Sequence, residues 1–492
     1  MTSLDSLTSW NSDWRGLRVA VIGLGVTGFS VADTLAELGC KTLVVAEKAE
    51  PEYLDILDVL GVQAITGTDA AGVPAALVEF APQLVVTSPG VRPDAAVIQW
   101  ANSEGIEVWV DIDLAWRLRD KTGAPAEWVC ITGTNGKTTT TQLTAAMLAA
   151  GGKRVAACGN IGVPILDCIR DPEGFDVLVV ELSSFQLHYL QQISPYSSAL
   201  LNLDHDHLDW HGDFEKYVAA KAKVYENTRV ACVYNAADKA TERALEQADV
   251  VEGARAIGFT VGVPAISQVG FAEEILCDRA FLNNRQNEAL QLAEIQDIES
   301  IGVLTPHLLA NVAAAAALAR SFDVSPDDIR TAILNFRMDA HRIELVAEKD
   351  GITWIDDSKA TNPHATAASL NSFDSVVWVV GGLLKGVDIT PLVKKFKAKL
   401  RGAVVIGEQR GDVLAALAAE AASVPVIEIS GEDKSQVMTQ AVAAAANLAS
   451  TGDTVLLAPA SASMDQFKDY ADRGRQFASA VKMHLGDMQN GN

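Results

Sequence analysis

The sequence has few aromatic residues, no C-x-x-C cysteine pair and no long apolar run. Its six cysteines are scattered and three lie inside apolar stretches, so we expect reduced thiols buried in a protein core. No stretch offers about 18 uninterrupted apolar residues, so we expect no membrane-spanning helix. Residues 1–16 lack the basic and then apolar pattern of a signal peptide. We therefore expect a cytoplasmic protein that is not held in a membrane.

Positive charge is scarce as well. The 39 lysines and arginines are outnumbered by 63 acidic residues, which gives a formal net charge of −24. Such a field repels nucleic acid and anionic membranes, so neither is an expected partner. A phosphate ligand must then be held by local lysines, helix N-termini and a divalent cation. The length of 492 residues is sufficient for about three domains.

What the sequence does contain is a glycine-rich turn between a strand and a helix. The apolar run at 128–131 predicts a buried strand, and residues 140–148 have the apolar spacing of a helix. Such a turn directs backbone N–H groups and the positive end of the helix dipole at one spot, where an anion binds. We predict a nucleotide site made by Gly133, Thr134, Asn135, Gly136, Lys137, Thr138 and Thr139.

Two residues of this turn have chemistry suited to a nucleotide. Lys137 supplies a mobile cation, and the Thr138 hydroxyl can ligate Mg²⁺ between phosphate oxygens. The motif departs from a full Walker A sequence, because Ile131 stands where its leading glycine would be. The alternative is a polar turn without a ligand.

An N-terminal unit begins at Leu17, where short β-branched runs alternate with helical segments. Strands are predicted at residues 17–23, 41–47, 62–67, 83–88 and 107–110. This alternation predicts a parallel sheet covered by helices. The first strand leads into Gly23-Leu24-Gly25-Val26-Thr27-Gly28, and Glu47 ends the second, which is the pattern of a dinucleotide-binding turn. The alternative is a turn that only allows tight packing of strand and helix, and the pattern does not distinguish NAD from a nucleotide-sugar.

Two groups of polar residues follow the phosphate turn. The apolar run 177–180 ends at Glu181, where a carboxylate would point into the ligand crevice of a parallel sheet and hold Mg²⁺, or cap the next helix. Residues 203–211 include six ionisable side chains, a density that favours a metal site, although spacing does not select the ligating histidine. Farther on, the plain interpretation of Lys221 is a solvated charge. The plain interpretation of Asn311 is a helix cap or a solvent-exposed side chain.

A third α/β unit follows residue 340. Strands are predicted at residues 353–355, 375–380, 402–406, 425–429 and 454–457, with polar loops after several of them. A polar segment at 117–126 separates the first unit from the second. We predict domains at residues 1–122, 123–338 and 339–492.

These motifs together resemble the ATP-dependent Mur ligases of peptidoglycan assembly, over nearly the whole chain. The resemblance rests on the turns at 23–28 and 133–137, the segments 159–162 and 181–187, and the third-unit segments 341–344, 357–362 and 462–470. It implies an N-terminal Rossmann-like domain, a central P-loop-like ATPase domain and a C-terminal Rossmann-like domain. Segments 182–187 and 357–362 resemble the members that add D-glutamate. The implied reaction joins D-glutamate to UDP-N-acetylmuramoyl-L-alanine, using ATP and Mg²⁺, through an acyl phosphate.

The resemblance also implies roles for single residues. The UDP-linked substrate would be held by Val26, Thr27, Ser88, Pro89, Gly90 and Asn160; ATP by Lys137, Thr138, Asn311, Arg342 and Asp357; D-glutamate by Lys359, Thr361, Lys385, Ser463 and Tyr470. Mg²⁺ would be ligated by Thr138, Glu181, His207 and a carbamylated Lys221, and the catalytic group would be Lys137, Glu181, His207, Lys221 and Arg342. His207 would also contact the substrate.

Two departures from the family pattern stand out. In the family, the acid that contacts the uracil is usually followed by Thr and Arg, whereas here the order is Ala46-Glu47-Lys48. Whether Glu47 or another residue holds the base therefore stays open. Tyr470 replaces a phenylalanine. We expect a monomer. Three other functions remain as alternatives: a related amide ligase such as one that polyglutamylates folate, a nicotinamide dehydrogenase based on residues 23–28, and a nucleotide-dependent switch without chemistry.

Overall fold

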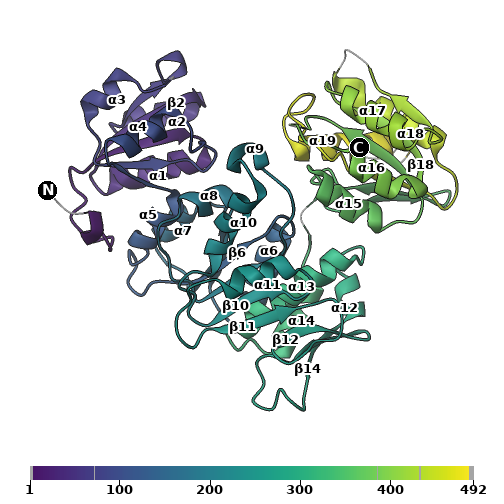
Figure 1. Cartoon of the computed structure of the whole chain (residues 1–492), viewed down its shortest axis with the longest axis horizontal. Coiled ribbons are helices and arrows are strands. Elements are labelled where there is room, and N and C mark those ends of the chain that lie inside the picture. The colour runs from purple at the N-terminus through teal and green to yellow at the C-terminus, as the bar shows by residue number, and fades with distance from the viewer. Residues whose placement is uncertain (1–3, 71, 339, 385, 431–433, 487–492) are drawn as a thin grey trace, which may run out of the picture. The chain divides into compact units, whose positions relative to one another are not determined.

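The computed structural model describes residues 4–70, 72–338, 340–384, 386–430 and 434–486. The chain forms two compact units, one of Met1–Ile295 with Ala310–Asn335 and one of Gln296–Leu309 with Phe336–Asn492. The first unit contains two sheets and the second unit one (Figure 1). The predicted fold class, α/β with three sheet-containing domains, is confirmed. The boundaries at 122/123 and 338/339 stay predictions. In the described part of the chain, no helix is both long and apolar enough to cross a membrane.

The N-terminal sheet is parallel throughout, with strand order β3-β2-β1-β4-β5. Because this order reverses between β1 and β4, the ends of these two strands border the crevice in which ligands of such sheets bind. The strand β2 runs two residues beyond the predicted end, so Glu47 lies inside it. The strands are β1 (Arg18–Leu24), β2 (Lys41–Ala49), β3 (Gln63–Thr66), β4 (Leu84–Thr87) and β5 (Glu107–Trp109); the helices are α1 (Val26–Glu37), α2 (Pro51–Val59), α3 (Ala75–Phe80), α4 (Ala96–Ser103) and α5 (Asp111–Leu118).

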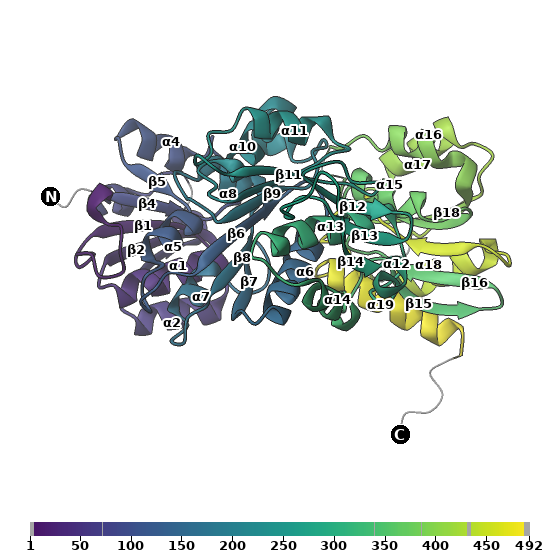
Figure 2. The ribbon, with the colours of Figure 1, turned by 90° about the horizontal axis from the view of Figure 1, so that it is seen from below.

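The central sheet has the order β14-β13-β12-β11-β10-β9-β6-β8-β7. Figure 2 shows β7, β8, β6 and β9 side by side, with β6 between β8 and β9. Strands β12 to β14 are antiparallel, an extension that the sequence analysis does not predict. The strands are β6 (Glu127–Thr132), β7 (Val155–Gly159), β8 (Val177–Glu181), β9 (Ser197–Leu200), β10 (Ala231–Asn235), β11 (Arg255–Phe259), β12 (Gln268–Ala272), β13 (Ile275–Asp278) and β14 (Leu290–Glu294).

Helices follow most strands of the central sheet. They include the helix of the phosphate turn, α6, which begins at Lys137 rather than at residue 140 because its first turn is polar. The helices are α6 (Lys137–Ala150), α7 (Ile165–Arg170), α8 (Ser184–Tyr189), α9 (Leu208–His211), α10 (Phe214–Ala222), α11 (Lys239–Glu246), α12 (Ile295–Glu299), α13 (Pro306–Arg320) and α14 (Pro326–Asn335).

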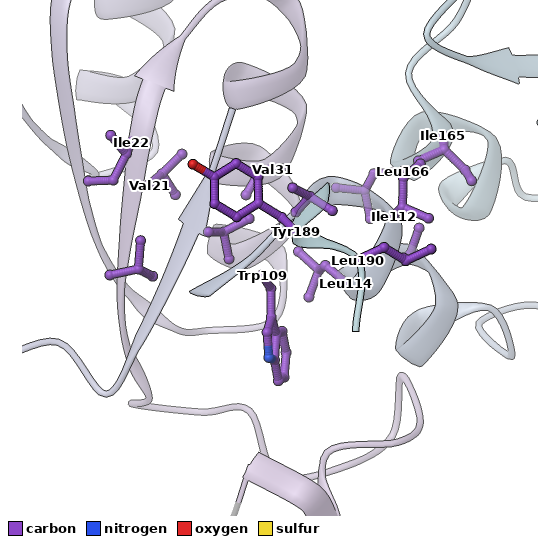
Figure 3. Packing of buried hydrophobic residues seen from close by; sticks show 14 of the residues in the cluster. Val21, Ile22, Val31, Trp109, Ile112, Leu114, Ile165, Leu166, Tyr189 and Leu190 are labelled. Atoms are coloured by element: carbon purple, nitrogen blue, oxygen red, sulfur yellow. The ribbon is translucent and has the colours of Figure 1, made fainter. Parts of the chain in front are cut away.

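One continuous apolar core joins the first two sheets. Figure 3 shows Trp109, Ile112 and Leu114 of the N-terminal part packed near Tyr189 and Leu190 of the central part. Polar contacts reinforce this core: the Arg170 side chain forms ion pairs with Asp33 at 2.5 Å and Glu37 at 2.8 Å. The two sheets are therefore held as one body, and the sites at their strand ends keep a defined relation. All six cysteines are free, and five are buried, as expected.

The second unit contains a six-stranded sheet with the order β15-β16-β20-β17-β18-β19. All five predicted strands are present, and the antiparallel edge strand β15 adds a sixth that the sequence analysis does not predict. The strands are β15 (Glu344–Lys349), β16 (Ile352–Asp356), β17 (Val376–Gly381), β18 (Leu400–Ile406), β19 (Val426–Glu428) and β20 (Thr454–Leu457); the helices are α15 (Pro363–Asn371), α16 (Thr390–Phe396), α17 (Gly411–Glu420), α18 (Val437–Leu448) and α19 (Tyr470–His484).

Candidate active site

The phosphate turn lies between the end of β6 and the start of α6, as predicted. Gly136 precedes the helix with a φ of 82°, a left-handed conformation that favours glycine. A Cβ atom at this position would lie 2.3 Å from Asn311 Oδ1, so the Asn311 side chain from α13 packs directly on the turn. Asn311 therefore neither caps its helix nor simply faces solvent, which makes the plain interpretation of this residue wrong.

A reciprocal amide pair holds the next part of the turn. The backbone N–H of Asn135 donates to Asn202 Oδ1 at 2.8 Å, and Asn202 Nδ2 donates to the carbonyl oxygen of Asn135 at 3.0 Å. Thr134 Oγ1 lies 2.8 Å from the Tyr217 hydroxyl. The sequence analysis misses Asn202 and Tyr217; a polar residue just after the strand next to β6 is the signal that could have found the first.

Lys137 and Lys221 meet at the same turn. Lys137 Nζ donates to the carbonyl oxygens of Gly133 and Thr134, both at 2.9 Å. Lys221 Nζ donates to the carbonyl of Gly133 at 2.8 Å and lies 3.3 Å from Thr132 Oγ1. Lys221 is only 2% exposed, so its interpretation as solvated charge is wrong. Burial, and then the charge of Lys137, lower the pKa of Lys221 well below its usual value.

Glu181 is the last residue of β8, next to the phosphate turn. It is 2% exposed. Its Oε1 accepts a bond from Asn160 Nδ2 at 2.9 Å, whereas Oε2 is buried and has no hydrogen-bond partner in the described part of the chain. The cap of the following helix is Ser183, which forms a capping box with Gln186. The alternative of Glu181 as a helix cap is therefore wrong, and an orphaned carboxylate oxygen beside a phosphate turn fits a Mg²⁺ ligand.

The three histidines of residues 205–211 have different surroundings. His205 stacks on Phe214 with ring centres 4.3 Å apart, and the buried His211 contacts Ser184 Oγ through Nε2 at 3.0 Å. His207 has a φ of 53° and caps α9. Burial lowers the pKa of His207, and the charges of Lys137 and Lys221 lower it further, against the opposing effect of Asp206. This proximity to both lysines favours His207 as the ligand, a role that stays a prediction.

The crevice between β1 and β4 brings the predicted substrate residues of the first sheet together. A Cβ on Gly23 would lie 2.6 Å from Ser88 Oγ, and one on Gly28 would lie 2.1 Å from the Gly23 carbonyl oxygen. Both positions therefore need glycine. Ser88 Oγ is buried without a hydrogen-bond partner in the described residues. Ser88 with Pro89 and Gly90 follows β4, and Val26 with Thr27 begins α1, so five predicted residues lie at the carboxyl ends of the neighbouring strands β1 and β4.

The second unit gathers its own predicted residues at strand ends. Asp357 follows β16 and is buried; its carboxylate accepts bonds from Ser369 Oγ and, at 3.4 Å, from the N–H of Ile343. Burial raises the pKa of Asp357 to about 6, against the opposing charge of Arg342. Lys359 Nζ lies 5.1 Å from the ring centre of Tyr470. Lys385 lies outside the described residues.

Arg473 links the two loops that carry these residues, and the sequence analysis misses it. Its guanidinium is fully buried and donates to Ser358 Oγ at 3.0 Å, to the Ser358 carbonyl at 2.9 Å and to the Ser461 carbonyl at 3.2 Å. These loops hold Lys359 and Thr361 on one side and Ser463 on the other. No local pattern marks Arg473, because its partners are distant in the sequence.

Three protein-family models match successive parts of the chain. The MurD-like N-terminal domain of Mur ligases matches residues 17–110, the Mur ligase middle domain residues 131–319, and the glutamate ligase domain of Mur ligases residues 341–461. A UDP-N-acetylmuramoylalanine--D-glutamate ligase from Leifsonia xyli subsp. xyli is 57% identical, over 98% of this chain and 96% of its own. The chain belongs to the Mur ligase family.

Other members of the Mur ligase family align over similar lengths. Proteins with the same printed name from Streptomyces coelicolor and Mycolicibacterium smegmatis are 48% and 41% identical, each over 96% of this chain and over 99% and 97% of their own. Among solved structures, the UDP-N-acetylmuramate-alanine ligase MurC from Thermotoga maritima has a TM-score of 0.54 at 19% identity, covering 96% of this chain and 100% of that one. The MurF ligase from Thermotoga maritima in complex with ADP has a TM-score of 0.55 at 17% identity, covering 99% and 100%. These two likenesses show the shared Mur ligase fold.

Proposed function

We propose that this Mur ligase joins D-glutamate to UDP-N-acetylmuramoyl-L-alanine, with cleavage of ATP to ADP and phosphate, in peptidoglycan precursor synthesis. The relatives of 41% to 57% identity that carry the name of this activity support the proposal. The observation that carries it within the molecule is the group of Lys137, Lys221 and Glu181 around the turn at Gly133. A nicotinamide dehydrogenase would leave this group without a role, and a nucleotide-dependent switch without chemistry would hydrolyse the nucleotide independently of any amino acid.

The first chemical step brings two anions together. The carboxylate of the substrate's alanine attacks the γ-phosphorus of ATP, ADP leaves, and an acyl phosphate forms. Lys137, together with the N–H groups at the start of α6, would stabilise the negative charge that builds on the phosphate oxygens. Arg342 of the second unit has the same assigned task. The substrate carboxylate and the triphosphate repel each other because both are negatively charged. Neutralising this repulsion with Lys137 and Arg342 is therefore the main contribution of the chain to this step.

In the second step, the amine of D-glutamate attacks the acyl carbon. A tetrahedral intermediate forms and then collapses with loss of phosphate, leaving an amide. Lys359, Thr361, Ser463 and Tyr470 are the described residues that would hold D-glutamate, with the Lys359 ammonium facing a carboxylate. Lys385 completes the predicted set.

The donor set beside the turn fits Mg²⁺. Glu181 Oε2 is buried without a partner in the described part of the chain, and Thr138, the second residue of α6, is 7% exposed. When bound, the ion supplies neutralisation of phosphate charge. Burial and the charge of Lys137 lower the pKa of Lys221 and so favour its neutral amine, the form that adds to carbon dioxide; the resulting carbamate would join Glu181, His207 and Thr138 as a ligand. We further infer that the protein acts in the cytoplasm as a monomer, since one chain carries residues for all three substrates.

Phosphate release tests the proposed function directly. With ATP, Mg²⁺ and UDP-N-acetylmuramoyl-L-alanine present, phosphate should appear with D-glutamate and not with L-glutamate. Lys137→Ala should slow this release by about 10²-fold or more, whereas a change of the exposed Lys153 to alanine should not. Release that is independent of any amino acid, or that prefers another acceptor such as a folate, would contradict the assignment.

A further inference from the structure

A cavity lies in the first unit, on a different face of α10 from the phosphate turn. Its volume is about 560 Å³. Lys216, Ala219 and Ala220 of α10 line it together with the C-cap residue Lys223, and their spacing places them on one face of the helix. Tyr217 and Lys221, which contact the phosphate turn, lie on another. The remaining walls come from the segment after β4, the end of α8, and α9 with the following glycine. No residue assigned to ATP, Mg²⁺ or either substrate is among those that line the cavity.

The charge of this cavity is opposite to that of the whole protein. Arg92, Lys216 and Lys223 line it with a single carboxylate, that of Asp94. Arg92 pairs with Asp94 at 2.9 Å, and Lys216 with Asp213 at 3.0 Å. Lys223 Nζ instead donates to two backbone carbonyls, of His188 at 2.9 Å and of Leu190 at 3.2 Å, and neither neutralises its charge. Local positive charge in a chain of net charge −24 attracts anions.

The cavity is also lined by aromatic side chains. Trp210 and His211 line it, and each is less than one tenth exposed. Trp210 Nε1 and His211 Nδ1 are buried without hydrogen-bond partners in the described part of the chain, which is unusual for polar atoms. His188, also in the lining, stands edge-on to Trp210 with ring centres 5.1 Å apart. Three cationic side chains together with indole and imidazole rings in one lining fit a ligand that has both a ring and a negative charge.

The cavity is connected to the proposed Mg²⁺ loop through α9. This helix has only four residues, its N-cap is His207, and its last two residues are Trp210 and His211. Phe185 contacts both ends, with ring centres 4.7 Å from those of His207 and of Trp210. A ligand that fixes Trp210 and His211 therefore also restricts the backbone that carries His207.

We propose that this cavity is a second, non-catalytic binding site for a small organic anion with an apolar ring, such as an aromatic carboxylate. Through α9, its occupancy is coupled to that of the phosphate turn. The binding site stands on the cavity alone, whereas the coupling rests on the proposed function, because it requires a magnesium nucleotide at Gly133–Lys137.

Isothermal titration with 2-naphthoate tests the binding site, and neutral 2-naphthylmethanol serves as the probe that keeps the ring and lacks the charge. Ala219 is exposed and lines the cavity, so Ala219→Phe should fill it; Ala149→Phe on α6 is the matched exposed control. We expect saturable binding of 2-naphthoate to the native protein and to Ala149→Phe. Binding to Ala219→Phe, and to the double variant Lys216→Gln/Lys223→Gln, should be weaker by about ten-fold or more.

Two results would overturn the site: undiminished binding to Ala219→Phe, or equal affinity for the neutral alcohol. Retained Mg·ADP binding by each variant shows that it is folded. For the coupling, the Kd of 2-naphthoate should change by about five-fold when Mg·ADP is saturating, because linkage is reciprocal. An unchanged Kd overturns the coupling. Failure of the native protein to bind Mg·ADP in a direct titration would count against the proposed function, not against the cavity.

Discussion

The side-chain nitrogens of Lys137 and Lys221 donate to one acceptor, the carbonyl oxygen of Gly133, at 2.9 and 2.8 Å. Two ammonium groups at a single carbonyl repel each other strongly when one of them is buried. Lys221 is the buried one, and its pKa is lowered first by burial and then by Lys137. The arrangement therefore favours Lys137 as the cation for phosphate and favours the neutral amine of Lys221.

Lys221 should carry a carbamate in the presence of carbon dioxide. Protein equilibrated with ¹³C-bicarbonate should show a carbamate carbon resonance that Lys221→Ala abolishes, together with a loss of activity of about 10²-fold or more. Lys216→Ala, which changes an exposed lysine of the same helix, should keep both the resonance and the activity. Near-normal activity of Lys221→Ala that bicarbonate does not raise would show that the amine needs no modification.

Gly136 should be required for more than its backbone conformation. Gly136→Ala strains a residue at a φ of 82° and also places a methyl group 2.3 Å from Asn311 Oδ1. Gly152→Ala is a matched control, since its φ is 81° and no atom lies within 4 Å of the added Cβ. Both variants should lose about 1 kcal/mol of stability from backbone strain, but only Gly136→Ala should lose ADP affinity in calorimetric titration. Equal ADP affinity in the two variants would contradict a nucleotide at this turn.

Arg473 should act as a positioning residue for the amino acid that the second unit receives. Arg473→Lys keeps the charge but cannot reach Ser358 and Ser461 with the same fork of donors. We expect the KM for D-glutamate to rise by about ten-fold with a smaller change in the KM for ATP. The control is Arg475→Lys, two residues along on the exposed side of α19. A uniform loss of protein stability without a selective effect on D-glutamate would reduce Arg473 to a structural role.

The contact between the first two sheets should weaken as pH rises from about 4 to 6. Burial raises the pKa of Asp111 and of Asp113 to about 6, against the opposing bonds from Gln186 to Asp111 and from the Gln191 N–H to Asp113. An unfolded aspartate titrates near 3.9. Between these values the folded protein binds more protons than the unfolded chain, so the free energy of unfolding falls with rising pH.

Replacing one of these carboxyls tests this pH dependence. In Asp111→Asn, the Tm should decline less steeply between pH 4 and 7 than in the native protein, because one group no longer ionises in a buried position. The exposed Asp55→Asn serves as the control and should keep the native slope. A slope in Asp111→Asn equal to that of the native protein would show that this carboxyl is already ionised at pH 4.

The alternation of strands and helices and the position of the phosphate turn follow from the sequence alone. A buried strand, a glycine-rich turn and an amphipathic helix are encoded by neighbouring residues, which is why β6, Gly136 and α6 lie where they are predicted. Glu181 is likewise found at a strand end because the apolar run before it marks the strand. The fold class could be predicted for the same reason: alternating strand and helix patterns favour parallel sheets.

Only the tertiary structure decided which polar residues are buried and what they face. Lys221 and Asn311 have ordinary helical surroundings in the sequence, and both are brought to the phosphate turn by the packing of α10 and α13. The burial of Arg473 and the antiparallel strands β12 to β15 were likewise found only in the tertiary structure. Burial and electrostatic environment depend on groups from distant parts of the chain, so the lowered pKa of Lys221 exists only once Lys137 and the surrounding core are assembled.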